Sequence, residues 1–209
     1  MTAAIVVLAK RPVAGQVKTR LVPPLCHDDA AALAAAALRD TLRVVNRMRV
    51  RRRILSFAGS PEGWLWPGWW HHRQPEGGLD TRMVAAIADA GSGPTVLVGM
   101  DTPQLQAAQL EAFDHSRYDA CLGLASDGGY WAIGLRDPAL AFVTIAGVPM
   151  STPHTGAEQL RRLRAHGLRV QLLDELCDVD TIDVAIDVAR LAPHSDFART
   201  FRALPQTVG

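Results

Sequence analysis

The stretch "AAIVVLAKRPVAGQVKTRLVPPL" (residues 3–25) holds the first structural element and the first candidate binding loop. It opens with a continuous apolar run, residues 3–9, that is rich in β-branched side chains. Such a run is typical of a strand that is buried on both faces, as in a parallel sheet. A loop with several cations, three prolines and one glycine follows at once. The stretch therefore predicts a central strand whose carboxyl end leads into a basic loop.

Segments typical of strands and helices alternate along the rest of the chain. We expect further strands at 52–59, 94–100, 118–125, 130–135 and 168–173, and helices at 28–48, 80–91, 104–116, 154–167 and 181–192. This alternation predicts an α/β fold in which helices cover both faces of a mostly parallel sheet. We expect one three-layer α/β/α domain over residues 1–209, with an antiparallel component where two strands follow each other closely at 118–135.

The composition narrows the class of protein. A formal net charge of +1 gives no global electrostatic reason to expect nucleic acid as a partner. No segment reaches the roughly 18 apolar residues of a membrane span, and the short apolar start does not follow basic residues as a signal peptide does. Three cysteines without a C-x-x-C pair fit a reducing compartment. We expect a cytoplasmic protein, and its oligomeric state stays open.

Two local segments each allow two interpretations. The basic run "RMRVRRR" (47–53) is either a helix end and strand entry or an anion-facing patch. The Trp-rich segment 60–78 is too irregular for a regular element, so we expect a long loop. That loop is either a hydrophobic flap over the sheet edge or a stacking platform for a base, sugar or acceptor, with Trp69 and Trp70 as its candidate contacts. The neighbouring His71 and His72 are weak candidates for a metal site, because adjacent side chains rarely point at one ion.

The loop after the first strand is a candidate phosphate-binding loop. It has neither the G-x-x-x-x-G-K-[ST] spacing of a Walker A loop nor the G-x-G-x-x-G of a dinucleotide fold. It does place Lys10, Lys18 and Arg20 at the carboxyl end of a strand, where ligands bind in open α/β sheets, and Gly15 allows a tight turn. Cations and backbone N–H groups in such a loop can hold a diphosphate. The alternative is a set of solvated surface cations.

Carboxylates follow two later segments. Asp101 comes directly after the buried strand at 94–100, and one carboxylate with water and phosphate oxygens is a typical Mg²⁺ or Mn²⁺ arrangement. Asp180, in "CDVDTIDVA" (177–185), is a candidate for the second carboxylate on that metal. The alternatives are helix caps, formed by Asp101 or Thr102 in the first segment and by Asp178 or Thr181 in the second.

A glycine pair lies in "ASDGGYWAIGL" (125–135). Gly128 and Gly129 would let backbone approach a ligand closely, and Asp127 could bind a hydroxyl or act as a base. A plain turn between two strands explains Ser-Asp-Gly-Gly nearly as well.

Six motifs in this order resemble the DUF2064 family, also called radical-SAM/selenodomain-associated transferase 1. They are "AKRPVAGQVKTRL" (9–21), "GGLDTRM" (77–83), "GMDTPQL" (99–105), "DGGYWAIGL" (127–135), "PMSTPHT" (149–155) and "DVDTIDVA" (178–185). The resemblance covers residues 3 to about 188 and implies a nucleotide-diphospho-sugar transferase fold of the GT-A type. The Trp-rich segment 64–70 is not part of the family pattern, which makes it a candidate for setting a specific acceptor.

The resemblance also implies roles for individual residues. It implies phosphate contacts for Lys18 and Arg20, a phosphate or substrate contact for Arg82, and metal ligation by Asp101 and Asp180. Gly128, Gly129 and Tyr130 would shape the acceptor side, and Ser151 and Thr152 would lie near the sugar or acceptor.

Three functions are compatible with these residues. The first is a metal-dependent glycosyltransferase that moves a sugar from a nucleoside-diphosphate sugar to a small-molecule acceptor, with Mg²⁺ or Mn²⁺ stabilising the departing diphosphate and Asp127 as the candidate base. The second is a nucleotidyltransferase that joins an NTP to a phosphorylated or phosphonate small molecule and releases pyrophosphate. The third is a non-catalytic nucleotide-binding protein. The family resemblance favours the first.

Overall fold

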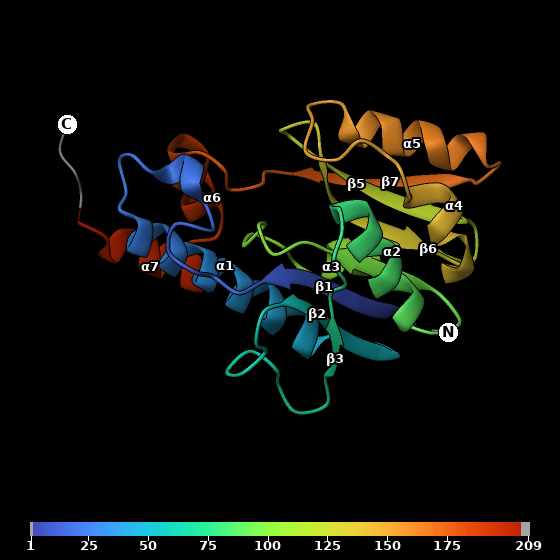
Figure 1. The fold of residues 1–209 in the computed structure, drawn as a ribbon, viewed down its shortest axis with the longest axis horizontal. Coiled ribbons are helices and arrows are strands. Elements are labelled where there is room, and N and C mark those ends of the chain that lie inside the picture. The colour runs from blue at the N-terminus through green and yellow to red at the C-terminus, as the bar shows by residue number, and fades with distance from the viewer. Residues whose placement is uncertain (1, 206–209) are drawn as a thin grey trace.

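The computed structural model describes residues 2–205 and contains one seven-stranded sheet with helices on both faces (Figure 1). The strand order is β3-β2-β1-β4-β6-β5-β7. All neighbouring strands are parallel except the two pairs that β6 makes, with β4 and with β5. This confirms the mostly parallel α/β sheet and the antiparallel component expected at 118–135.

Most elements agree with the expected ones to within a few residues. The strands are β1 (Ala4–Lys10), β2 (Arg52–Ala58), β3 (Trp70–Arg73), β4 (Thr95–Val98), β5 (Ala120–Ala125), β6 (Tyr130–Leu135) and β7 (Val170–Leu176). The α-helices are α1 (His27–Arg47), α2 (Leu79–Asp89), α3 (Ala107–Glu111), α4 (Ala141–Ile145), α5 (Thr155–Ala165), α6 (Ile182–Leu191) and α7 (Asp196–Ala203), and 3₁₀ turns cover Thr19–Leu21 and Pro138–Leu140.

The central strand β1 feeds both hydrophobic cores. Ile5 and Val7 join the core under α1, while Ala4 and Val6 join the opposite core under α2 and α4. Successive side chains of a strand point to opposite faces, so a strand covered on both sides must be apolar at every position. The burial of β1 on both faces confirms what its composition predicted.

A third core holds the first loop against the C-terminal part of the chain. α1, α6 and α7 lie together at one end of the molecule (Figure 1), and their small apolar side chains pack into one cluster. Leu21 and Leu25 of the first loop and Val179 of the "DVDT" segment are buried in the same cluster. The core therefore fixes Lys18 and Arg20, which lie close to Leu21 in sequence, near the carboxylates that flank Val179.

The basic run 47–53 is a helix end and strand entry in this structure. Arg51 and Arg52 donate to the carbonyls of Ala90 and Asp89 at the end of α2, at 3.3 and 3.2 Å, and Arg53 donates to the carbonyl of Val45 in α1 at 3.1 Å. Cations at helix C-termini interact favourably with the unpaired carbonyls there. The run begins β2, so it lies at the opposite end of the strand from the carboxyl edge where ligands bind.

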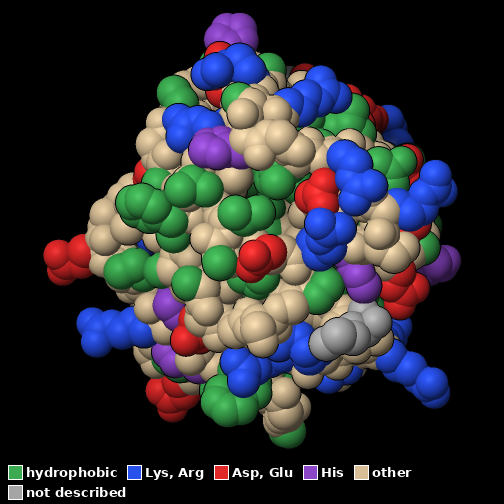
Figure 2. Space-filling view, turned by 90° about the vertical axis from the view of Figure 1, so that its right-hand side faces the viewer, with side chains coloured by type: hydrophobic (Ala, Val, Ile, Leu, Met, Phe, Trp, Pro, Cys, Tyr) green, Lys and Arg blue, Asp and Glu red, His purple; other side chains and the backbone are tan. Residues whose placement is uncertain are grey.

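Two further observations concern the charges on the surface and the apolar character of the helices. On the face drawn in Figure 2, Lys and Arg side chains are interspersed with hydrophobic and acidic ones. Within residues 2–205, no helix combines the length and the apolar character that a membrane crossing requires.

Two expected elements were wrong in extent. The helix expected at 104–116 is reduced to the five residues of α3, because Gln106 and Gln109 cap its start reciprocally and Phe113 turns into the core two residues after its end. The segment 60–78 is not only a loop, since it contains the edge strand β3, which pairs in parallel with β2. The short helices α4 and α7 were not expected.

Trp69 and Trp70 have different environments at the start of β3. Trp69 is 8% exposed, belongs to the core under α1, and donates from Nε1 to Oδ1 of Asn46 at 3.0 Å. Trp70 is 59% exposed, and the guanidinium carbon of Arg52 lies 4.5 Å from the centroid of its ring. Trp69 therefore anchors the segment as a flap, whereas Trp70 covers an arginine at the sheet edge.

This difference predicts unequal effects of truncation. Trp69→Ala should lower the free energy of unfolding by about 3–5 kcal/mol, because it empties a large core site and leaves the Asn46 amide without its partner. Trp70→Ala should cost only about 0.5–1 kcal/mol, as expected for an exposed cation–π contact. Urea denaturation of the two variants measures the difference. Similar losses from both would contradict the assignment of Trp69 to the core.

Candidate functional site

A cavity of about 780 Å³ lies at the carboxyl ends of β1 and β4 and at the start of the antiparallel strand β6. Ten of the residues singled out from the sequence line it: Lys10, Arg20, Arg82, Asp101, Asp127, Gly129, Tyr130, Ser151, Thr152 and Asp180. Gly15, Lys18, Gly128, Trp69 and Trp70 are not among the lining residues. Lys18 nevertheless reaches two carboxylates of the cavity.

Asp101 is positioned by a backbone contact with the "DVDT" segment. β4 ends at Val98, and the N–H of Gly99 donates to the carbonyl of Trp131 at 3.0 Å, which prolongs the pairing with β6. The carbonyl of Asp101 then accepts a 3.0 Å hydrogen bond from the N–H of Val179. This bond brings the two aspartates on either side of Val179 to the end of β4. The two carboxylate motifs therefore meet although they lie far apart in sequence.

Lys18 is buried between two of these carboxylates. Its side chain is only 6% exposed, and Nζ lies 2.6 Å from Oδ1 of Asp101 and 3.0 Å from Oδ1 of Asp180. Burial alone would lower the pKa of Lys18, but the charges and hydrogen bonds of Asp101 and Asp180 more than offset this, and the pKa is raised. Lys18 is therefore a cation at neutral pH. Arg20 reaches the other oxygen of Asp180 at 3.2 Å from a solvent-exposed position.

Asp178 is a third carboxylate at this point. Its Oδ1 is buried and has no hydrogen-bond partner among the described residues. Burial, followed by the negative charge of Asp101, raises the pKa of Asp178 to about 7. The cap of α6 is not Asp178 but Thr181, whose side chain accepts from the N–H of Val184 at 3.4 Å. The helix-cap alternative for Asp178 is therefore wrong, and its free oxygen faces a group of charges.

The donor set fits a hard divalent cation. No ready-made group of three His, Cys, Asp or Glu side chains in metal-binding geometry exists within residues 2–205. Oxygens of Asp101 and Asp180 nevertheless converge on a single cationic atom, Lys18 Nζ, and Asp178 contributes an oxygen without a partner. Carboxylate oxygens are the ligands that Mg²⁺ and Mn²⁺ prefer. Asp101, Asp180 and Asp178 are the residues that would hold such an ion.

Another part of the cavity lining is built from a turn and a half-buried tyrosine. Oδ1 of Asp127 accepts from the N–H of Gly129 at 2.8 Å, and no hydrogen bond from another described residue engages Oδ2. The hydroxyl of Tyr130 donates to Oε1 of Gln159 at 3.3 Å. Burial raises the pKa of Tyr130, so its hydroxyl stays protonated. Ser151, with φ of 58°, lies on the rim of the cavity.

Gly128 is required by the chain's own packing. Its φ is +87°, and a Cβ there would lie 2.0 Å from the carbonyl oxygen of Pro153. Its carbonyl accepts from the N–H of Gly156 at 2.8 Å, so the turn rests directly on the start of α5. The close approach expected at this glycine is therefore made by residues 153–156, and it holds Asp127 and Gly129 in place.

Gln74 is a cavity residue that the sequence did not single out. Its Nε2 donates to the carbonyls of Ala9 and Ser56, both at 2.9 Å, so its amide orientation is fixed and Oε1 remains available. Gln74 lines the cavity because it directly follows β3. Recognition of β3 as a strand would have placed Gln74 at the carboxyl edge, but no apolar–polar alternation marks that strand.

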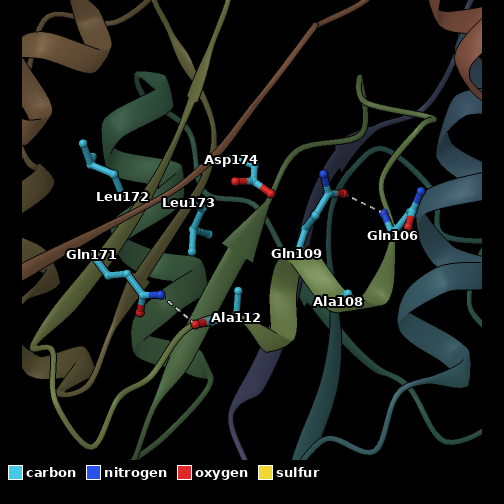
Figure 3. Close-up of a pocket in the computed structure, with 8 residues that line it drawn as sticks. All are labelled: Gln106, Ala108, Gln109, Ala112, Gln171, Leu172, Leu173 and Asp174. Carbon is cyan, nitrogen blue, oxygen red and sulfur yellow. Dashed lines mark hydrogen bonds between the residues drawn. The ribbon is translucent and has the colours of Figure 1, made fainter.

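A smaller cavity of about 360 Å³ lies between α3 and β7 (Figure 3). Its polar side chains largely bond to the chain itself: Gln171 donates to the carbonyl of Ala112 at 2.8 Å, and the side chain of Gln109 accepts from the N–H of Gln106 at 2.9 Å. The one ionisable residue in its described lining is Asp174. This cavity lacks the combination of cations and carboxylates that the larger one has.

Comparison with known proteins places the chain in a family. The chain belongs to the family described as "Uncharacterized protein conserved in bacteria (DUF2064)", whose model matches residues 30–152. This confirms the family that the six motifs predicted. None of the curated proteins matches the chain.

Solved structures show the same fold. A "putative nucleotide-diphospho-sugar transferase" from Desulfovibrio desulfuricans G20 superposes with a TM-score of 0.85 at 27% identity, over 97% of this chain and 95% of that one. Rv0371c from Mycobacterium tuberculosis H37Rv, in complex with manganese, gives 0.53 at 18% identity over 98% and 100%. The 2-C-methyl-D-erythritol 4-phosphate cytidylyltransferase from Thermus thermophilus gives 0.55 at 15% identity over 92% and 100%. The fold is therefore of the nucleotide-diphospho-sugar transferase (GT-A) type, as expected.

The packing of Gly128 predicts a large cost for one added methyl group. Gly128→Ala should lower the free energy of unfolding by at least about 2 kcal/mol more than Gly167→Ala. Both glycines have positive φ, but a Cβ at Gly167 meets nothing within 4 Å, whereas one at Gly128 overlaps the Pro153 carbonyl. Chemical denaturation of the two variants measures this difference. Equal costs would contradict the close contact between the turn and α5.

Proposed function

We propose that the protein is a metal-dependent transferase that uses a nucleotide-activated donor, and that it transfers a sugar from a nucleoside-diphosphate sugar to a small-molecule acceptor. The observation that carries the proposal is the pair of carboxylates, Asp101 and Asp180, that share one cation at the carboxyl edge of the sheet. The Desulfovibrio protein, which is 27% identical and described as a "putative nucleotide-diphospho-sugar transferase", supports the donor class.

The distribution of charge in the cavity supports transfer of a sugar rather than a nucleotide. The cations that line it, Lys10, Arg20 and Arg82, come from β1, the first loop and α2. The described lining segments from Asp127 to Tyr130 and from Met150 to Thr155 include no Lys or Arg. A phosphorylated acceptor beside Asp127 would find no cation within these two segments. An acceptor that offers a neutral hydroxyl group fits them better.

The chain's own residues have distinct parts in the proposed reaction. Lys10, Arg20 and Arg82 would hold the diphosphate and stabilise the charge that develops as the bond from the anomeric carbon to phosphate breaks. Oδ2 of Asp127 would accept the proton of the acceptor hydroxyl, because its Oδ1 is held by Gly129. A divalent ion at the three carboxylates near the end of β4 would neutralise the departing diphosphate when bound. The structure of Rv0371c with manganese supports the choice of Mn²⁺ for a first test.

Thermal unfolding with a panel of nucleotide sugars, nucleoside diphosphates and NTPs, each with and without Mn²⁺, tests the proposal. One nucleotide sugar and its diphosphate should raise Tm by roughly 5–10 °C at about 100 times Kd, since this concentration stabilises the folded state by about 2.7 kcal/mol. Asp101→Asn should remove most of the Mn²⁺-dependent part of the shift. Asp187→Asn, which changes an exposed carboxylate on α6, should retain it.

Two outcomes would contradict the proposal. Stabilisation by one NTP alone, with pyrophosphate released when a phosphate-bearing acceptor is added, would establish nucleotidyl transfer instead. Unchanged nucleotide affinity and metal dependence in Asp101→Asn would favour a nucleotide-binding protein without catalysis. Chromatography with and without candidate acceptors then measures whether the stabilising nucleotide sugar releases its nucleoside diphosphate. That product shows that the bond between the sugar and the diphosphate breaks.

A further inference from the structure

The position of Lys18 differs from that of the other cations at the cavity. Lys10 directs Nζ to the carbonyl of Gln16 at 3.0 Å, and the side chain of Arg20 is 74% exposed. Lys18 is almost fully buried, and its Nζ contacts one oxygen each of Asp101 and Asp180. The residue that the family resemblance assigns to phosphate binding therefore points at the two proposed metal ligands.

An ammonium group and a divalent ion cannot occupy this position together. The two contacted oxygens lie 2.6 and 3.0 Å from Nζ, and Mg²⁺ or Mn²⁺ held by the same oxygens would lie about 2 Å from each. The ion would therefore overlap Nζ in space, and the two positive charges would repel each other at this short distance. A metal ion can bind both carboxylates only after Lys18 has moved.

The charge balance explains why Lys18 is held there in the ligand-free protein. Asp101, Asp178 and Asp180 lie together, and carboxylates that are close and partly buried destabilise one another unless a cation is present. Lys18 provides that cation. Its four-carbon stem is flexible enough to move Nζ by several ångströms without movement of the backbone, and its loop borders the same cavity as Lys10 and Arg20.

We propose that Lys18 is a displaceable internal cation: it occupies the metal position in the ligand-free protein and moves to the donor diphosphate when the metal ion binds. The inference rests on the metal and diphosphate site of the proposed function. It adds that the metal ion binds tightly only when a diphosphate is present to accept Lys18. Metal alone binds weakly because it must displace Lys18 without offering it a new partner. A diphosphate offers that partner, so metal and diphosphate bind cooperatively.

Mn²⁺ binding without nucleotide, measured by electron paramagnetic resonance of free Mn²⁺, tests the first part. Lys18→Met should bind Mn²⁺ at least about tenfold more tightly than the unaltered protein. Lys10→Met is the matched control, because it removes one positive charge from the same region without touching a carboxylate, and its affinity should stay within about threefold. Equal affinities of Lys18→Met and the unaltered protein, or equal gains in both variants, would overturn the proposal.

Chemical labelling of the unaltered protein tests the same inference without a variant that must fold. In acetylation by acetic anhydride followed by mass spectrometry, Lys18 should be protected in the free protein and become reactive at saturating Mn²⁺. It should be protected again when inorganic pyrophosphate is added with Mn²⁺. Lys10 is the internal reference for the comparison with and without Mn²⁺ alone, because the proposed function assigns Lys10 to the diphosphate as well. Continued protection of Lys18 at saturating Mn²⁺, or no renewed protection with pyrophosphate, would overturn the proposal.

These outcomes are separable from failure of the proposed function. If nucleotide sugars stabilise the protein with Mn²⁺ but Lys18→Met binds Mn²⁺ no more tightly, the donor assignment stands and only the role of Lys18 is wrong. If neither the unaltered protein nor Lys18→Met binds Mn²⁺ while nucleotide still binds, the metal site is wrong, and the role of Lys18 is overturned with it.

Discussion

The ion pairs of one buried lysine with two carboxylates are the constraint on which the site depends. Lys18 lies in the first loop and Asp180 lies 162 residues later, and the charge of Lys18 could not be buried there at low cost without its carboxylate partners. The nearby apolar residues make the meeting possible: Leu21 and Val179 are buried in the same core, so hydrophobic burial brings both segments to one place. The charges select the local geometry, and the apolar contacts supply the stabilisation that holds it.

The sheet topology explains why this meeting takes place at Asp101. β1 and β4 are parallel neighbours, so the first loop and Asp101 emerge at adjacent strand ends. The segment after β7 starts two strands away from β6, at the far edge of the sheet, and must return across it. Hydrogen bonds guide its return: the side chain of Gln104 donates to the carbonyl of Cys177, and the N–H of Val179 donates to the carbonyl of Asp101. The site is thus assembled from three distant segments of the chain by ordinary hydrogen bonding.

The sequence predicted the parts of the fold that depend on local pattern and missed those that depend on partners. β1 was recognisable because a strand buried on both faces must be apolar throughout, and the edge position of Asp101 follows from its place directly after such a strand. β3 was not recognisable, because Trp70–Arg73 shows no alternation and forms only by pairing with β2, and Gln74 was missed with it. The reason for Gly128 lies in Pro153, which is distant in sequence, and spacing cannot reveal it. Nor can spacing tell whether a lysine faces phosphate or carboxylate.

The lining segments of the cavity differ in charge. The first loop and α2 contribute cations, the three carboxylates lie near the end of β4, and the segment from Asp127 to Tyr130 contributes no cation. An anionic donor is favoured beside the cations and disfavoured beside Asp127, because like charges repel each other at short distances. The turn at Gly128 holds Asp127 in place, and the third core holds the loop of Lys18 near the carboxylates. The proposed reaction therefore needs little rearrangement of the fold: the one residue that must move is the lysine that neutralises the carboxylates until a metal ion replaces it.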